Sequence, residues 1–323
     1  MNKNTRIKAA LAGAEVDRVP LSFWLHFPDI DFNGPLLAER LIEFNDRFDL
    51  DFIKVMPSGL YTVVDWGCEI QRFNNPYDVP IVVNFAINSP ADWDALSVLD
   101  ICSGAWGEEI RTLEVLADQI GGEVPFVETI FSPLTTAFKL AGEKLFAHVK
   151  DAPDVLHRGL EVITETTVSF VEAACQRGIS GVFFATQCAT SDWMSLDAYN
   201  EFGKRYDLQV LSALGESTYL NILHVHGSNT YFKELCDYPV SALNWHDRLT
   251  YPSLSQARAL TAKCLVGGIN EYDIVEKSNS DVKSEVRHAI ESNNGRGLII
   301  APGCVLPTRI PQERLKLLRE SVG

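Results

Sequence analysis

The chain has 323 residues, of which 46% are hydrophobic and 22% are charged, with a formal net charge of -15 at pH 7. This composition indicates a globular protein that is large enough for one α/β barrel or two smaller domains. The negative charge argues against nucleic acid or an anionic membrane surface as partners, because both attract basic proteins. No apolar run approaches the roughly 20 residues of a membrane span, and the polar N-terminus does not resemble a signal peptide. We therefore expect a cytoplasmic protein with reduced cysteines.

Short apolar runs, each closed by turn or polar residues, recur along the chain and alternate with amphipathic helical patterns. Runs of this length are typical of parallel strands that are buried on both faces. Eight such strands alternating with helices predict an α/β fold, a single (β/α)8 TIM barrel over residues 1–323. A doubly wound open sheet is the alternative, but no GxGxxG sequence follows the first run. The predicted strands are residues 19–25, 52–56, 124–130, 179–185, 220–225, 241–245, 264–269 and 297–301.

The interval between the second and third predicted strands is too long for one helical crossover. It contains two β-like runs, residues 61–73 and 79–87, on either side of a turn at 74–76. These runs predict a β-hairpin that is inserted after the second strand and lies over the barrel mouth. Such an insertion either helps to form a binding surface or shields the barrel.

Histidine and cysteine residues occur where two of the predicted strands end. The fifth strand ends at His224 and His226, and Cys304 follows the eighth strand. Residues two apart in a strand point to the same side, so the two imidazoles are presented together. With the cysteine they would make the three protein ligands of a catalytic site for zinc or another divalent transition metal. The alternative is a pair of hydrogen-bonded histidines and an inert buried thiol.

Other polar residues also lie at predicted strand ends, where the active sites of barrels of this type are found. Glu128 is a candidate fourth ligand or proton acceptor, or else a carboxylate that caps or pairs at the barrel rim. His246 and Asp247 are candidates for acid–base chemistry or for support of metal-bound imidazoles, and alternatively belong to a hydrogen-bonded loop. The residues that we expect to bind substrate are His26, Gln187, Asn244 and Asn270.

Motifs spread over the whole chain resemble those of the uroporphyrinogen decarboxylase superfamily. They are residues 17–21 (Asp-Arg-Val-Pro-Leu), residues 132–135 (Ser-Pro-Leu-Thr) with Gly142, and residues 303–308 (Gly-Cys-Val-Leu-Pro-Thr) followed by Pro311. The superfamily also contains zinc-dependent methyltransferases that exchange methyl groups between corrinoid proteins and thiols. These motifs indicate the superfamily and do not distinguish between its reactions.

The residues that mark a true uroporphyrinogen decarboxylase are missing. That family has an arginine-rich segment after the opening proline, whereas residues 22–28 contain no arginine. Its catalytic aspartate has no counterpart in residues 55–59, its tyrosine falls on Phe138 or Lys139, and its final histidine falls on Cys304. An octacarboxylate would be hard to bind here, because unpaired substrate charge keeps its desolvation cost.

The methyltransferase branch is more similar to this chain. Its zinc ligands are a His-x-Cys-Gly on the fifth strand and a cysteine in the final Pro-Gly-Cys motif, which match His224, His226 in place of a cysteine, and Cys304. Imidazole in place of thiolate raises the net charge of the site and makes the metal a stronger Lewis acid. The resemblance implies a methyltransferase that acts on a small-molecule substrate, with zinc as cofactor and a corrinoid protein as partner, and it leaves a homodimer open. The alternatives are a cofactor-independent decarboxylase, for uroporphyrinogen or a related substrate, and a non-catalytic binding protein.

Overall fold

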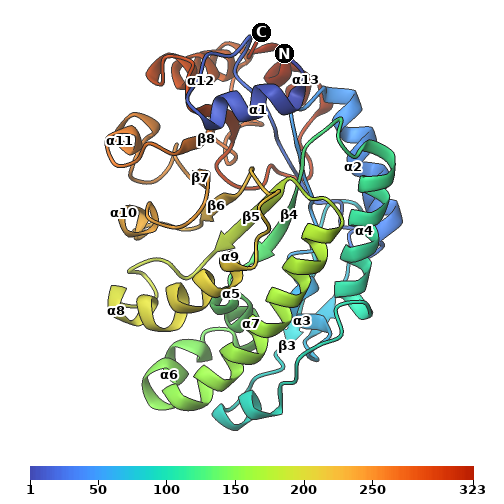
Figure 1. Cartoon of the computed structure of the whole chain (residues 1–323), viewed down its shortest axis with the longest axis vertical. Helices are drawn as coiled ribbons and strands as arrows, with labels where there is room; N and C mark the ends of the chain where they lie inside the picture. Colours follow the sequence, from blue (N-terminus) through green and yellow to red (C-terminus); the bar gives the residue numbers. More distant parts are fainter.

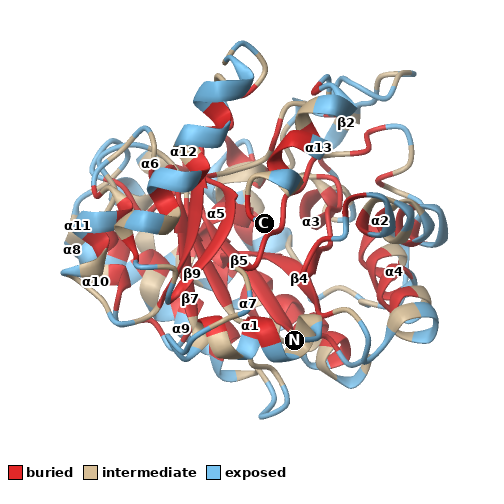
Figure 2. Ribbon diagram, turned by 90° about the horizontal axis from the view of Figure 1, so that it is seen from above, coloured by how far each residue is buried: buried red, intermediate tan, exposed pale blue.

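The computed structural model describes all residues from Met1 to Gly323, and its centre is a curled sheet of seven parallel strands. Figure 1 shows the helices packed along the outside of this sheet, and Figure 2 shows buried strands at the centre of a ring of helices. The strand order is β1-β4-β5-β6-β7-β8-β9. The bounds are β1 (Ile53–Lys54), β4 (Phe126–Phe131), β5 (Gly181–Thr186), β6 (Ile222–Val225), β7 (Ala242–Trp245), β8 (Cys264–Ile269) and β9 (Leu298–Pro302).

The helices begin where the sequence provides end signals. The side chains of Asn2 and Asn33 cap α1 and α2 by accepting backbone N–H groups, and prolines occupy the first turns of α5 and α7. None of the helices is both long and apolar enough to cross a membrane. Their bounds are α1 (Lys3–Leu11), α2 (Gly34–Phe48), α3 (Tyr61–Val64), η1 (Pro90–Ala95), α4 (Gly104–Ile120), α5 (Pro133–Ala141), α6 (Lys144–Asp151), α7 (Pro153–Gln176), α8 (Leu196–Tyr199), η2 (Asn200–Lys204), α9 (Arg205–Ser212), α10 (Phe232–Leu235), α11 (Leu254–Arg258), α12 (Asn279–Ser292) and α13 (Gln312–Glu320).

Seven of the predicted strands are confirmed, and the first one, residues 19–25, is not a regular strand. This segment forms only an isolated parallel bridge between Leu21 and Ile300. The Ser22 N–H donates to the Ile300 carbonyl at 3.0 Å, and the Ile300 N–H donates to the Pro20 carbonyl at 2.8 Å. Pro20 has no N–H group to extend a ladder, which limits regular pairing here. The sheet therefore has seven strands, with an extended segment beside β9.

Asp51 joins this extended segment to the first strand and to helix α1. Its backbone N–H donates to the Leu21 carbonyl at 2.8 Å, and its fully buried carboxylate accepts the Leu21 N–H at 2.8 Å. The guanidinium groups of Arg6 and Arg18 each donate to the same carboxylate at 2.6 Å. A buried carboxylate with this many donors is fully paired, so it stabilises the arrangement of all three segments.

The inserted hairpin is confirmed as the antiparallel strands β2 (Glu69–Gln71) and β3 (Ile81–Asn84). The prediction was wrong at residues 61–64, which form the short helix α3, because the side chains there pack against α4 and α5. The hairpin turn contacts the loop after β9. Thr308 donates its hydroxyl to the Tyr77 carbonyl at 2.7 Å, and the Arg309 guanidinium lies 4.2 Å from the centre of the Tyr77 ring.

We predict that Asp51→Ala lowers the free energy of unfolding by about 3–5 kcal/mol, because it removes the buried acceptor that Arg6, Arg18 and the Leu21 N–H share. Denaturant unfolding followed by circular dichroism measures the change. Asp94→Ala is the matched control, since the Asp94–Arg158 ion pair is about half exposed on both sides and is expected to matter far less. Equal losses in the two variants would contradict the role given to Asp51.

Candidate metal centre

A cavity of about 230 Å³ opens at the C-terminal ends of the strands. Residues from β1, β4, β5 and β6 line it, together with the segment after β9 and residues of α5. Its walls combine aromatic rings, such as those of Trp24 and Phe183, with cationic and metal-binding types of side chain. The latter are Lys54, Lys139, His224, His226 and Cys304.

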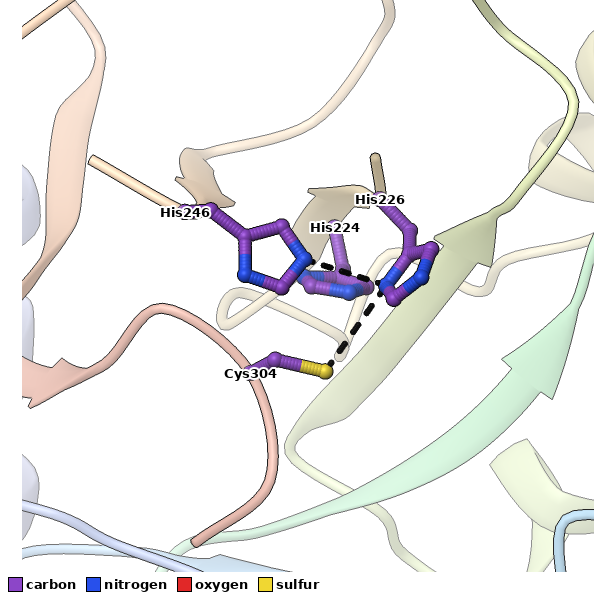
Figure 3. A group of neighbouring side chains, drawn as sticks. All are labelled: His224, His226, His246 and Cys304. Atoms are coloured by element: carbon purple, nitrogen blue, oxygen red, sulfur yellow. Dashed lines mark hydrogen bonds between the residues drawn. The ribbon is translucent and has the colours of Figure 1, made fainter. Parts of the chain in front are cut away.

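Three side chains that line this cavity, His224, His226 and Cys304, converge with that of His246, and each of the four could offer one ligand atom (Figure 3). Their ligand atoms all lie within 4.8 Å of one another. His224 lies in β6 and His226 directly follows it, His246 follows β7, and Cys304 belongs to the loop after β9. The His226 Nδ1 atom is 3.1 Å from His246 Nε2 and 3.8 Å from the Cys304 sulfur. The sequence predicted three of these four residues as metal ligands. His246, which was expected to act in acid–base chemistry or in support, joins them in the structure.

Asn244 fixes the orientation of the His224 ring. Its amide nitrogen donates to the Val266 carbonyl at 2.8 Å and to the Pro302 carbonyl at 3.0 Å. The amide oxygen therefore faces His224 Nδ1, 2.6 Å away, and must accept the proton on that nitrogen. The Nε2 atom of His224 is left with a free lone pair, which is the form that binds a metal.

Glu271 fixes the orientation of the His246 ring and also holds the loop that carries Cys304. One carboxylate oxygen is hydrogen-bonded to His246 Nδ1, and the other accepts the Gly303 N–H at 3.2 Å. The His246 Nε2 atom is thus directed at the cluster. Gly303 permits the close approach, because a Cβ atom there would lie 2.8 Å from both the His246 Cα atom and the Trp245 carbonyl oxygen. Only glycine fits immediately before Cys304.

Burial determines the protonation of the cluster. It lowers the pKa of His224 well below its usual value and lowers the pKa of His226 to about 4, with the neighbouring histidines as a smaller cause. Burial also raises the pKa of the Cys304 thiol to about 11. Near neutral pH these two imidazoles are therefore neutral, and the cysteine is a thiol until a cation takes the place of its proton.

The structure does not bring Glu128 to the cluster. Residues next to each other in a strand point to opposite faces, and it is Thr129 that lines the cavity. Glu128 is buried on the other face of β4, where both its carboxylate oxygens lack a hydrogen-bond partner. Burial raises its pKa to about 8, and burial also raises the pKa values of Tyr61 and Glu109, with the charge of Glu128 as a smaller cause. The structure therefore does not support Glu128 as a metal ligand.

Three other predicted site residues organise the strand ends and do not line the cavity. Asn244 is fully buried, and its polar atoms are all used in the contacts described above. Asp247 accepts the Gly268 N–H at 3.0 Å, and Asn270 accepts the Tyr272 N–H at 3.0 Å. The expectation of substrate contact is therefore not supported for Asn244 and Asn270, because neither side chain lines the cavity.

His26 and Gln187 do line the cavity, as a substrate-binding role requires. The Nδ1 atom of His26 is buried without a partner, and burial lowers the pKa of this histidine to about 3. Two further residues of the cavity, Lys54 and Lys139, were missed. A lysine within the apolar run 52–56 was the available signal, since lysines are almost never fully buried unless paired.

The fold and the site together define a class of protein: a parallel α/β sheet with a buried histidine and cysteine cluster at its C-terminal edge. The family model for uroporphyrinogen decarboxylase (URO-D) matches residues 2–323, and the chain belongs to this family.

Individual relatives are distant but cover most of the chain. A methylcobamide:CoM methyltransferase MtaA of Methanosarcina barkeri is 23% identical over 97% of this chain and 95% of its own length. A uroporphyrinogen decarboxylase of Cellvibrio japonicus is 24% identical over 84% of this chain and 77% of its own. Among solved structures, a methyltransferase from Methanosarcina mazei superposes with a TM-score of 0.87 at 21% identity, covering 99% of this chain and 98% of that one. This last likeness establishes the fold.

We predict that Asn244→Ala lowers the free energy of unfolding by about 3 kcal/mol, because it leaves two buried carbonyls and the His224 N–H unpaired. Gln187→Ala is the control at the same strand edge. Its side chain lines the cavity without a hydrogen bond, so we expect a loss of at most about 1 kcal/mol. Denaturant unfolding of both variants provides the comparison. If Asn244→Ala left the free energy of unfolding unchanged, the role given to the Asn244 hydrogen bonds would be contradicted.

Proposed function

We propose that this protein is a metal-dependent methyltransferase that moves a methyl group between a corrinoid and a thiol-type acceptor. The observation that carries the proposal is the convergence of His224, His226, His246 and Cys304 in one cluster, of which all but His246 line the cavity. The names of the methyltransferase relatives support the reaction, since the Methanosarcina barkeri protein is named for methyl transfer from a methylcobamide to CoM. A corrinoid protein is the proposed partner.

The donor set fits a zinc ion. Imidazole and thiolate are preferred zinc ligands, and the Nε2 lone pairs of His224 and His246 are already directed inward by Asn244 and Glu271. Cys304 supplies the only anionic ligand. We assign His224, His226 and Cys304 as ligands, and His246 as a fourth ligand or as the group that substrate displaces.

The residues of the chain would then act in distinct ways. A bound zinc ion would lower the pKa of a coordinated thiol and so supply a thiolate near neutral pH. His26 and Gln187 face the same cavity and would orient the acceptor. Trp24 and Phe183 form apolar walls that exclude water from it. Asp247 holds the loop after β7 against β8 and would act only by positioning His246.

The decarboxylase alternative is less well supported. None of the residues that line the cavity is an arginine, and its volume of about 230 Å³ is small for a tetrapyrrole with eight carboxylates. Cavities for drug-sized ligands are commonly about 300–1,000 Å³. A small acceptor suits this space better than a porphyrin precursor.

We also propose that the sheet is closed into a barrel, with the extended segment at residues 20–22 in the place of the eighth strand. The barrel would form a single domain over residues 1–323. The support is that this segment is hydrogen-bonded to Ile300 on one side and to Asp51 on the other. A closed ring would explain why β1, at the end of the strand order, needs no further partner.

We predict that Cys304→Ser lowers zinc affinity at least about tenfold to a hundredfold, because even residues that only support a ligand have effects of this size. Serine keeps the size of the side chain and loses the thiolate. Cys188→Ser is the control, since Cys188 is buried but lies outside the cluster. Competition with a chromogenic chelator, on protein purified without a metal-affinity tag, gives the affinities. Unchanged affinity in both variants would remove Cys304 from the ligand set.

We predict that zinc-loaded protein transfers the methyl group of methylcobalamin to a small thiol and that chelation abolishes the reaction. Absorbance of the corrinoid and mass spectrometry of the methyl thioether follow the two products. The same preparation is expected to leave uroporphyrinogen without measurable conversion to coproporphyrinogen. Turnover of uroporphyrinogen that survives chelation would overturn the proposal.

A further inference from the structure

A groove of about 370 Å³ lies on the outside of the sheet between α2 and α13, which are neighbours there. Its floor is apolar and includes the side chains of Leu25, Phe27, Phe44 and Ile310. The centres of the Phe27 and Phe44 rings are 5.7 Å apart. Sites for small molecules commonly have volumes of about 300–1,000 Å³, so this α2–α13 groove is large enough for one.

The α2–α13 groove lies behind one wall of the metal centre's cavity. Trp24 and His26 line the cavity, whereas Leu25 and Phe27 line the groove. Successive residues of an extended segment point to opposite sides, so one stretch of backbone separates the two spaces here. A ligand in the groove would therefore touch the outer side of a segment whose inner side faces the cavity.

The loop after β9 forms the rest of this common wall. Cys304 lines the cavity, and Ile310 lines the α2–α13 groove. Between them, the Leu306 N–H donates to the Trp24 carbonyl at 3.0 Å and ties the loop to the segment 24–27. The groove is thus in contact with both segments of the wall and contains none of the four clustered side chains.

Two arginines of α2 stand at the edge of the groove. Arg40 and Arg47 are seven residues apart, which places them two turns apart on one face of the helix. The Arg47 side chain is exposed and makes neither an ion pair nor a hydrogen bond. Arg40 has a single carboxylate neighbour, Glu43, at 3.9 Å. Both side chains of that pair are well exposed, and such pairs contribute little.

We propose that the α2–α13 groove is an effector site, which binds a small organic acid with its apolar body on Phe27 and Phe44 and its acidic group on Arg40 and Arg47. Guanidinium groups match the geometry of carboxylates and phosphates. The Arg40 guanidinium already lies 5.5 Å from the centre of the Phe27 ring. In a protein with a net charge of -15, two arginines beside an apolar groove distinguish this surface for an acid.

The first test compares acidic probes with a neutral analogue on metal-free protein. We expect 2-naphthoate and 2-naphthyl phosphate, observed by ligand NMR, to bind at least about tenfold more tightly than 2-naphthamide, because charge-assisted hydrogen bonds are the strong ones. The two acids separate carboxylate from phosphate as the preferred group. Equal affinities for the acids and the amide would overturn the proposal.

Variants locate the probes. Arg40→Met and Arg47→Met are each expected to weaken binding of the acids at least about fivefold, with little change for the amide. The matched control is Arg287→Met, at an exposed arginine of α12 that has no ion pair and lies outside the groove.

Gln312→Trp, at an exposed residue that lines the groove, should block all three probes by filling it. Circular dichroism checks that each variant is folded, and if Gln312→Trp is not, the two arginine variants decide. Acid binding that persists in Gln312→Trp, or that neither arginine variant weakens, would overturn the assignment.

Zinc affinity measures the effector role. Binding of the acid is independent of the proposed function, whereas the effector role rests on the proposed metal centre. We expect saturating 2-naphthoate to change the zinc affinity of the parent at least about fivefold, and zinc must change the affinity for 2-naphthoate by the same factor, because linkage is reciprocal. The same concentration should have a smaller effect on Arg47→Met.

The outcomes of this measurement distinguish the two proposals. Binding of 2-naphthoate without any change in zinc affinity would overturn the effector role. A parent protein that binds 2-naphthoate but no zinc would overturn the proposed metal centre and the effector role with it, while the acid site would stand.

Discussion

The hydrogen bonds of Asn244 constrain the site more than any other interaction. From β7 its side chain reaches His224 on β6, Val266 on β8 and Pro302 on β9, so one buried amide joins four neighbouring strands. Its two donors are taken by backbone carbonyls, which leaves a single orientation for its oxygen and a single tautomer for the histidine. The position of the His224 imidazole is therefore set by the sheet itself.

The alternation of strands and helices was predictable from the sequence because each parallel strand is buried on both faces and is recognisable as a short apolar run. The same reasoning located His224, His226 and Cys304, since residues at the C-terminal ends of strands must meet at one edge of the sheet. It did not assign His246 to the cluster, because the sequence does not show which way a side chain in a loop turns. That direction depends on Glu271, which lies 25 residues further along the chain.

Other features could not be predicted from local sequence patterns, because they depend on strand register and tertiary packing. Glu128 and Thr129 are adjacent, and a shift of one residue in a strand decides which of them faces the cavity. Residues 61–64 have the composition of a strand, yet tertiary packing makes them a helix. Lys54 lies inside an apolar run and is compatible in sequence with either a snorkelling surface lysine or a buried one. Only the completed fold shows that its ammonium stays within the cavity.

The cavity has two walls that come from separate stretches of the chain. Trp24, Lys54 and Lys139 belong to the first half, whereas His224 and Cys304 belong to the second. The clustered histidines and the cysteine therefore all come from the second half of the chain, whereas the rest of the cavity lining comes from both halves. A substitution at Trp24, Lys54 or Lys139 would therefore reshape the cavity wall without changing the clustered histidines and cysteine, or the Asn244 and Glu271 side chains that orient two of the histidines.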